Sequence, residues 1–287
     1  MRTIAFATCQ EFPELVDDDK LLIDILQKHN INYQAIPWDA EGIDWKGFSA
    51  VIVRSAWDYA LKAGKFLEWI DMLQYEKVNV WNPASVLRWN VDKKYLFELE
   101  QKGVPIIPTV LIPQGAPYDL EGLFKEKRWE RIVFKSTIDQ QGRDVFYGDS
   151  SELSALKMKL DALVSKKDAL AQPFVESVRT EGEYSFIFIG GEYSHAALKV
   201  QTLKELQTTR RTGGVVVRKT EPPESFIEEA KTIMRAVETP LLYARVDAVN
   251  IDGRLHVMEI ECIEPVLYFQ FHPPAAEHFA QEIADCL

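Results

Sequence analysis

Two short runs near the C-terminus alternate charged and apolar residues, and this alternation is the feature that most limits how the chain can fold. Residues 243–247 read Tyr-Ala-Arg-Val-Asp, and residues 257–261 read Val-Met-Glu-Ile-Glu. Successive side chains of a β-strand point to opposite faces, so Glu259 and Glu261 share one face of their strand. Carboxylates this close repel one another unless a cation or an arginine lies among them. The pattern predicts a metal site on one face of a hairpin, and Mg²⁺, which takes oxygen ligands, fits it best.

The turn between the two runs decides which charged residues meet. A two-residue turn at 252–253 would place Asp247 opposite Met258 and split the acids between both faces of the hairpin. A three-residue loop, with Gly253 as a left-handed bulge, would instead bring the acids and Arg245 to one face. We therefore predict the three-residue loop. The alternative interpretation is a solvated polar face on an edge hairpin, which is common in antiparallel sheets.

Charge and composition exclude several classes of function. The net charge of −11 over 287 residues lacks the basic character of proteins that bind nucleic acids or anionic membranes. No apolar run approaches the length of a membrane span, and the first one, residues 4–9, is too short for a signal-peptide core. Three widely spaced cysteines favour a reducing compartment over a disulfide framework. We expect a cytoplasmic protein without nucleic-acid or membrane partners, and a homodimer is the commonest default.

The order of strand and helix patterns predicts an α/β fold that becomes α+β toward the C-terminus. The first third alternates the two patterns, which indicates a small parallel sheet with helices on its faces. Predicted strands cover 3–8, 33–38, 50–54, 132–137, 143–147, 171–175, 184–189, 193–200 and 215–219. Predicted helices cover 20–29, 66–75, 92–102 and 152–164. The polar stretch between Gln201 and Gly214 predicts a mobile loop that could serve as a lid.

Three lysines, Lys93, Lys135 and Lys199, stand where a core residue or a helix cap is expected. Lys135 ends a predicted strand just before a turn, so its ammonium group can reach phosphates, as a β-strand lysine does in kinases. Lys93 lies at a predicted helix start, where free backbone donors favour an anion. Taken singly, a lysine in such a position is more often a surface lysine with a packed aliphatic stem. Together with three carboxylates they match magnesium-phosphate chemistry.

Two further segments suit ligands, and each has an ordinary structural alternative. Residues 172–176 follow a strand and could offer backbone groups to an adenine edge, or could be a plain connection. Arg54 lies at the end of the third predicted strand, where open parallel sheets bind ligands, and could hold a substrate carboxylate. Alternatively, Arg54 pairs with Asp58. His195 is interpreted as structural, and the glycine-poor stretch 137–142 matches no phosphate-loop fingerprint.

In their order along the chain, these stretches resemble the ATP-grasp superfamily, in particular its glutathione synthetase-like branch and the cycloserine cyclo-ligase group. The resemblance rests on residues 54–59, 89–93, 133–135, 172–175, 182–185, 194–199, 211–214, 243–247 and 258–265. It covers nearly the whole chain, and it implies ATP held between two lobes. The implied domains are a substrate-side domain at 1–88, a central lobe at 89–175 and a C-terminal lobe with the metal site at 176–287.

The resemblance also implies roles for individual residues. Phosphates of ATP would be bound by Lys93, Lys135 and Lys199. The adenine would be bound by Gln172, Phe174 and Val175, and the ribose by Glu183. Mg²⁺, or Mn²⁺, would be held by Asp247, Glu259 and Glu261. Arg245 and Arg211 would face the acyl phosphate and the attacking group. The substrate would be bound by Arg54, Ser55 and Ser185.

The implied activity is an ATP- and Mg²⁺-dependent carboxylate-amine ligase or cyclo-ligase, acting through an acyl phosphate on a small amino-acid-like substrate. Two residues depart from the usual pattern of the superfamily. Glu261 stands where many relatives carry asparagine, and Ser136 stands where proline often follows the strand lysine. The alternatives are an ATP-binding regulatory protein without ligase activity and a phosphotransferase.

Overall fold

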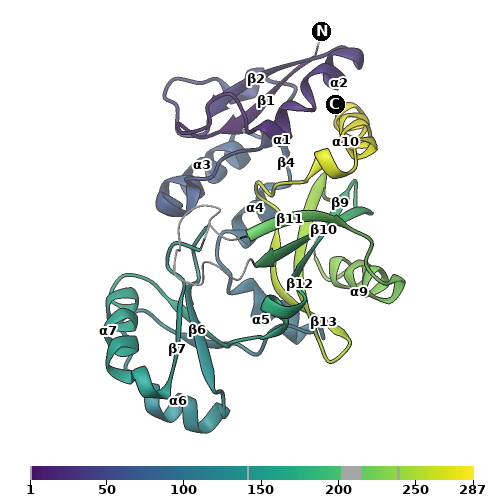
Figure 1. Cartoon of the computed structure of the whole chain (residues 1–287). Helices are drawn as coiled ribbons and strands as arrows, with labels where there is room; N and C mark the ends of the chain where they lie inside the picture. The colour runs from purple at the N-terminus through teal and green to yellow at the C-terminus, as the bar shows by residue number, and fades with distance from the viewer. Residues whose placement is uncertain (1, 141, 202–214, 238–239) are drawn as a thin grey trace.

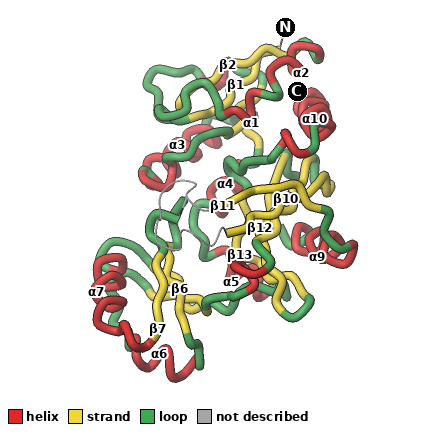
Figure 2. The backbone as a smooth tube through the Cα atoms, viewed as in Figure 1, coloured by secondary structure: helices red, strands yellow, loops and turns green. Residues whose placement is uncertain are grey.

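Three sheets make up the molecule, and the computed structural model describes them over residues 2–140, 142–201, 215–237 and 240–287 (Figure 1). The N-terminal sheet lies at the top of the view, the central sheet at the lower left and the C-terminal sheet at the right (Figure 2). This α/β architecture agrees with the predicted fold class. The predicted domain limits stay predictions.

The N-terminal sheet is parallel throughout, in the order β2-β1-β3-β4. Its strands are β1 (Arg2–Thr8), β2 (Ile31–Pro37), β3 (Ala50–Val53) and β4 (Val80–Trp81). Its helices are α1 (Asp17–Lys20), α2 (Ile23–Lys28) and α3 (Ala63–Tyr75), with short 3₁₀ turns at Trp45–Gly47 and Tyr59–Leu61. The predicted alternation of strands and helices is confirmed here, although the helix predicted at 20–29 is two short helices.

The central sheet is antiparallel, in the order β5-β8-β6-β7. Its strands are β5 (Val110–Ile112), β6 (Arg131–Ser136), β7 (Phe146–Asp149) and β8 (Ala169–Pro173). Helices α6 (Leu120–Lys127) and α7 (Leu153–Val164) pack on it, and the 3₁₀ turn Ser150–Glu152 leads into α7. The strand predicted at 143–147 begins only at Phe146. Helix α6 was not predicted, although Asp119 caps it by accepting from the Gly122 amide at 2.9 Å.

The C-terminal sheet is antiparallel and carries the candidate site, in the order β11-β10-β9-β12-β13. Its strands are β9 (Glu183–Ile189), β10 (Glu192–Gln201), β11 (Val215–Thr220), β12 (Tyr243–Ile251) and β13 (Arg254–Glu261). The remaining helices are α4 (Ala84–Asn90), α5 (Tyr95–Gln101), α8 (Ser177–Thr180), α9 (Glu224–Met234) and α10 (Pro274–Asp285), with a 3₁₀ turn at Phe269–Phe271. Helix α10 returns to lie beside α2, so the two chain ends are close together (Figure 1). None of the described helices has the length and apolar character needed to cross a lipid bilayer.

Side chains of helices α4 and α5 form hydrogen bonds with the backbone at the end of β13, the edge strand of the hairpin. The Asn90 side chain donates to Ile260 O and accepts from Cys262 N, both at 2.7 Å. The Tyr95 hydroxyl donates to Ile260 O at 2.9 Å and accepts from Ile260 N at 2.8 Å. An edge strand is thus fixed by side chains where a further strand would otherwise pair. This anchoring sets the position of Glu259 and Glu261.

Asn82 joins the two strands of the hairpin to the N-terminal sheet, and we expect Asn82→Ala to destabilise the fold strongly. Its fully buried amide donates to Tyr243 O at 2.8 Å and Cys262 O at 2.7 Å, and accepts from Leu242 N at 2.8 Å. Alanine would leave these backbone groups unpaired, which costs about 3 kcal/mol of unfolding free energy. Urea unfolding measures this loss.

Asn79→Ala is the matched control, because the exposed Asn79 amide also donates to backbone carbonyls, at 3.0 and 3.5 Å. We expect it to cost less than about 1 kcal/mol, since water replaces exposed hydrogen bonds. Equal losses for both variants would contradict the anchoring role of Asn82.

Candidate functional site

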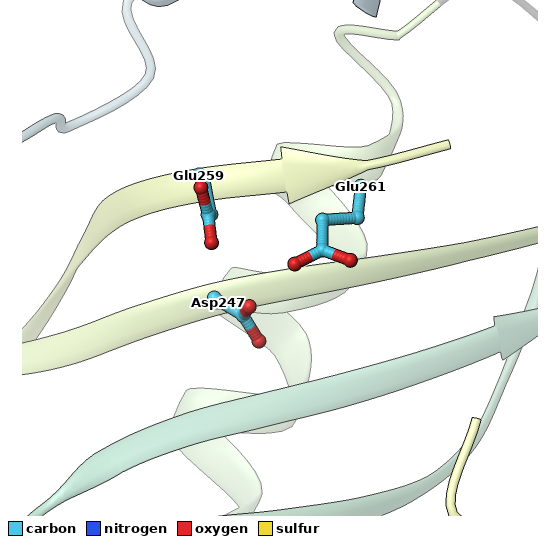
Figure 3. A group of neighbouring side chains, drawn as sticks. All are labelled: Asp247, Glu259 and Glu261. Carbon is cyan, nitrogen blue, oxygen red and sulfur yellow. The ribbon is translucent and has the colours of Figure 1, made fainter. Parts of the chain in front are cut away.

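Asp247, Glu259 and Glu261 converge on one face of the C-terminal sheet (Figure 3). Each offers a carboxylate oxygen, and these oxygens all lie within 4.8 Å of one another. Asp247 is fully buried and Arg245 beside it is 5% exposed. The solvated polar face that remained as an alternative is therefore wrong.

The turn of the hairpin differs from the prediction, yet the predicted face is formed. Asp252 and Gly253 make a two-residue turn with φ of 53° and 82°, and Ile251 pairs with Arg254. The pairing then shifts between Asp247 and Ala248, so that Asp247 lies opposite Glu259. The three-residue loop is wrong because a β-bulge within the strands, rather than the loop, supplies the extra residue. A three-residue loop and a β-bulge each place the acids on one face of the hairpin.

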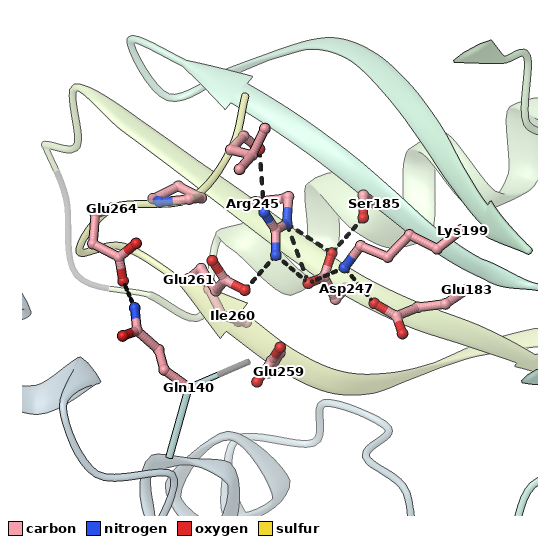
Figure 4. Close-up of polar contacts among 12 residues, drawn as sticks. Gln140, Glu183, Ser185, Lys199, Arg245, Asp247, Glu259, Ile260, Glu261 and Glu264 are labelled. Carbon is pink, nitrogen blue, oxygen red and sulfur yellow. Dashed lines mark hydrogen bonds and ion pairs between the residues drawn. The ribbon is translucent and has the colours of Figure 1, made fainter. Parts of the chain in front are cut away.

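Asp247 is held by cationic and hydroxyl donors from three strands (Figure 4). Arg245 donates to both of its oxygens at 2.8 to 3.1 Å. Ser185 Oγ donates at 2.6 Å, and Lys199 Nζ donates at 2.9 Å. Lys199 also contacts Glu183 at 2.6 Å. The predicted ribose, phosphate and metal residues thus contact one another directly.

The nearby cations do not compensate the three carboxylates of this cluster equally. Burial opposes ionisation of Asp247, but Arg245 and Lys199 outweigh it and lower the pKa of Asp247 below its ordinary value. Burial likewise opposes ionisation of Glu259, while Lys93 at 3.5 Å lowers its pKa. For Glu261, the effect of burial is larger than that of the nearby cations and raises the pKa, although Arg245 donates to this carboxylate. An extra cation would therefore be favoured most strongly near Glu261.

Lys93 and Lys135 approach the cluster from the central lobe. Lys93 does not start a helix as predicted: α5 begins at Tyr95, and the Lys93 amide donates to Thr137 O at 2.8 Å. Its backbone donor is thus not available to an anion, whereas its ammonium group lies 3.5 Å from Glu259. Within the described residues, the Lys135 ammonium makes no hydrogen bond or ion pair, and burial lowers its pKa to about 8.

We expect Lys135→Met to stabilise the protein without nucleotide while weakening ATP binding. The unfolded chain holds the lysine proton up to about pH 10.5, but the folded chain releases it at about 8. Stability therefore rises with pH between these values, and the cost of burying the charge is fully present below pH 8. At pH 7 the variant should gain about 1 to 2 kcal/mol of unfolding free energy.

Urea unfolding at several pH values and calorimetric ATP titration measure both effects. The stability gain should shrink between pH 8 and 10, and ATP affinity should fall roughly tenfold or more. Lys65→Met, at an exposed position of α3, is the control and should change neither quantity. A stability gain that does not depend on pH would contradict the assignment to Lys135.

The segment predicted to hold adenine, residues 172–176, begins within the last two residues of β8, and its aromatic residue packs on a cation. The Phe174 ring lies 3.9 Å from the Arg131 guanidinium carbon and 5.1 Å from the Tyr147 ring. The Phe174 amide donates to Arg131 O at 2.9 Å, so an adenine contact through a backbone donor falls to Val175. The Gln172 amide donates to Thr109 Oγ1 at 2.8 Å.

Arg54 lies in a buried ion pair. It is 1% exposed and donates to Asp19 at 2.6 and 3.0 Å and to Pro265 O at 2.6 Å. Ser55 Oγ donates to the other oxygen of Asp19 at 2.8 Å. The alternative that Arg54 pairs with Asp58 is wrong, because Asp58 accepts from Lys62 and Trp38 instead. A substrate role for Arg54 and Ser55 stays a prediction.

Arg211 with the predicted lid, and His195, are the remaining features predicted from the sequence. Arg211 and the lid predicted within 201–214 fall outside the described residues, apart from Gln201 at the end of β10. His195 is buried and donates from Nε2 to Leu267 O at 3.0 Å, which matches its structural interpretation.

The sequence did not single out the polar residues that border the metal cluster on the central-lobe side. The Gln140 amide donates to the Glu264 carboxyl group (Figure 4). Lys93 Nζ donates to Asp139 O at 2.7 Å. Burial raises the pKa of Glu264 well above its ordinary value. The sequence signals were weak: stretch 137–142 matched no phosphate-loop fingerprint, and stretch 258–265 belonged to the family resemblance but gave Glu264 no role.

The residues present fit both Mg²⁺ and the phosphates of a nucleotide. Three convergent carboxylates supply the oxygen ligands that Mg²⁺ prefers. Lys135, without an anionic partner in the described chain, supplies a cation that phosphate oxygens would pair with.

Comparisons with known proteins agree with this geometry. The profile of the family described as D-cycloserine synthetase DcsG, N-terminal domain, matches residues 4–82. The cycloserine biosynthesis protein DcsG of Streptomyces lavendulae is 30% identical over 279 residues, which are 93% of this chain and 92% of that protein. The crystal structure of D-cycloserine synthetase DcsG superposes with a TM-score of 0.86 at 26% identity, over 99% of both chains.

More distant structures share the fold. D-alanine–D-alanine ligase from Bacillus anthracis has a TM-score of 0.73 at 13% identity, over 100% of this chain and 96% of that one. An ATP-grasp RimK domain protein from Sphaerobacter thermophilus also has a TM-score of 0.73, at 15% identity over 100% and 99% of the two chains. The chain therefore belongs to the ATP-grasp superfamily, in the D-cycloserine synthetase DcsG family of ADP-forming carbon-nitrogen ligases.

Proposed function

We propose that this protein is an ATP- and Mg²⁺-dependent ligase that activates a carboxylate as an acyl phosphate and joins it to an amine in a small amino-acid-like substrate. The observation that carries the proposal is the convergence of Asp247, Glu259 and Glu261 with Lys93, Lys199 and Arg245 on one sheet face. A cluster of this kind combines metal ligands with cations that neutralise a transferred phosphoryl group.

In this proposal, ATP is bound between the central and C-terminal sheets. Lys93, Lys135 and Lys199 bind its phosphates, and Glu183 binds the ribose. Gln172, Phe174 and Val175 line the adenine site, where the Arg131 guanidinium supports the Phe174 ring at 3.9 Å. Because Lys199 contacts both Glu183 and Asp247 at present, nucleotide binding would exchange some of these contacts for phosphate oxygens.

Asp247, Glu259 and Glu261 would hold Mg²⁺, with Mn²⁺ as a substitute of similar ligand preference. The metal, when bound, neutralises phosphate charge and orients the phosphates. Ser185 and Arg245 keep the Asp247 carboxylate in place, and Arg245 also faces the acyl phosphate. Arg211 is proposed to face the attacking amine, and Arg54, Ser55 and Ser185 are proposed on the substrate side.

The names of the relatives favour an intramolecular reaction. Cycloserine contains a cyclic amide, and opening that bond with water gives O-amino-serine, a single molecule that carries both the carboxylate and the amine. We therefore propose cyclisation of an O-substituted serine as the leading reaction, with ligation of two separate molecules as the second possibility. The carboxylate oxygen first attacks the γ-phosphorus of ATP, which forms the acyl phosphate and displaces ADP. The nitrogen then attacks the acyl carbon, loses a proton and displaces phosphate.

Measuring ADP, free phosphate and organic product together tests this proposal. The protein with MgATP is incubated with O-amino-D-serine, O-amino-L-serine, D-serine and D-alanine, singly and in pairs. ADP and phosphate in equal amounts with an amide product support a ligase. ADP with a persistent phosphorylated product indicates a phosphotransferase. ATP binding without substrate-stimulated ADP release indicates the regulatory alternative and overturns the ligase.

Two further features belong to the proposal. The three cysteines are free thiols, and Cys9 and Cys262 are buried, which suits the reducing cytoplasm. A homodimer stays a prediction, which light scattering on the purified protein tests directly.

A further inference from the structure

A cavity of about 140 Å³ lies between the N-terminal and central lobes, beside the metal cluster. Its volume is many times that needed for one water molecule. One side comes from the turn after β3, and the other comes from the loop between β6 and β7 and the turn before β8. The residues that matter here are Trp57, Leu61, Asp139, Gln140, Asp144 and Lys167.

The cavity contains a buried carboxylate, Asp139, and although the Arg143 side chain also lines the cavity, no ion pair joins the two among the described residues. Asp144 and Lys167 pair at 2.8 Å and so neutralise each other. Asp139 is 8% exposed and accepts from the Asp144 amide at 3.3 Å, and no described side chain forms an ion pair with it. A buried carboxylate of this kind attracts a cationic ligand, because a partner offsets the cost of its burial.

Gln140 also lines the cavity, but its free acceptor is closed off from that space. The Gln140 amide nitrogen donates to Glu264, which orients the group, while its carbonyl oxygen is buried and has no hydrogen-bond partner among the described residues. Trp57 forms the opposite wall, and its indole nitrogen donates to Glu264 O at 3.4 Å. The Asp139 carboxylate and an aromatic wall form a suitable environment for an ammonium group.

Lys93 connects this cavity to the metal cluster. Its single ammonium group lies 2.7 Å from Asp139 O and 3.5 Å from the Glu259 carboxylate. A short molecule whose carboxylate reacts at the metal cluster would therefore place its other end at the cavity.

We propose that this cavity binds the ammonium group of the amino-acid-like substrate, with the Asp139 carboxylate as the acceptor and Trp57 as the wall. The inference rests on the proposed ligase function and deepens it by naming the part of the substrate that is recognised. Asp139 is then a specificity-determining residue that recognises the positive charge on the α-nitrogen of the substrate.

Paired substrates test this assignment. Each is offered with and without the α-ammonium group: O-amino-D-serine against 3-aminooxypropanoate, and D-alanine against propanoate. The wild-type protein should use the analogue without the ammonium group at least roughly tenfold less well, measured as kcat/KM for ADP release. Asp139→Asn should lower kcat/KM for the amino-acid substrate and remove this preference, while KM for ATP stays within about twofold.

Controls separate recognition from damage to the fold. Asp24→Asn, at an exposed position of α2, should retain the wild-type preference. If Asp139→Asn does not fold, Trp57→Leu provides the same test, because loss of the aromatic wall should also weaken the preference. Retention of the full preference in a folded Asp139→Asn or Trp57→Leu variant overturns the inference. A wild-type protein that releases no ADP with any substrate overturns the proposed function instead.

Discussion

Glu259→Gln is expected to reduce ADP release by about a thousandfold or more, with little change in the fold. Among the described residues, Glu259 is the acid of the cluster that accepts no hydrogen bond, and its one ion pair there is with Lys93, at 3.5 Å. Asp247 and Glu261, by contrast, are held by Arg245. Glutamine keeps the shape of the side chain but removes the charge that a Mg²⁺ ligand needs. ADP release at saturating substrate, measured over a range of Mg²⁺ concentrations, checks this expectation.

The result distinguishes a metal ligand from a residue that only shapes the site. If Glu259 binds the metal, higher Mg²⁺ concentrations should partly restore activity, and the affinity for ATP without metal should change little. Glu121→Gln serves as the control, because Glu121 is an exposed residue of α6 that pairs with Lys125 at 2.6 Å. Full activity of Glu259→Gln would show that the metal assignment is wrong.

Local periodicity was sufficient to predict the face that carries the acids. Alternation with period two placed Arg245, Asp247, Glu259 and Glu261 together, and the structure confirms this grouping. The turn was mispredicted because the alternation constrains only the final face. A bulge beyond Asp247 restores that face just as a longer loop would. The position of a bulge depends on pairing between strands, which a single strand pattern does not contain.

Partners that are distant in sequence could not be predicted in the same way. Arg54 was paired with Asp58 because the two are close in sequence, yet its buried partner is Asp19. Asp139 and Glu264 border the candidate site only because the central lobe folds against the end of β13. Such contacts depend on how the lobes pack, and no periodicity in the chain reports that packing. The resemblance supplied the family and the proposed nucleotide roles, but not these residues at the border of the site.

Arg245→Gln should both inactivate the protein and destabilise it without metal. The guanidinium group donates to Asp247 at 2.8 to 3.1 Å, to Glu261 and to Val266 O at 3.2 Å. Its loss leaves two carboxylates with fewer cationic partners in a buried site, which costs about 3 to 5 kcal/mol of unfolding free energy. ADP release should fall about a hundredfold or more, because this cation also faces the proposed acyl phosphate. Urea unfolding and ADP release measure the two losses.

Adding Mg²⁺ separates the electrostatic role of Arg245 from simple packing. A cation bound to Asp247, Glu259 and Glu261 replaces part of the charge that the arginine supplied, so Mg²⁺ should raise the thermal midpoint of Arg245→Gln more than that of the wild type. Arg254→Gln is the matched control on the other strand of the same hairpin, because Arg254 is exposed beside the turn. It should leave stability, activity and the response to Mg²⁺ unchanged. If Mg²⁺ stabilises the wild type and Arg245→Gln equally, the arginine does not compete with a metal for these carboxylates. Its effect would then come from packing against Tyr268, whose ring lies 5.8 Å from the guanidinium carbon.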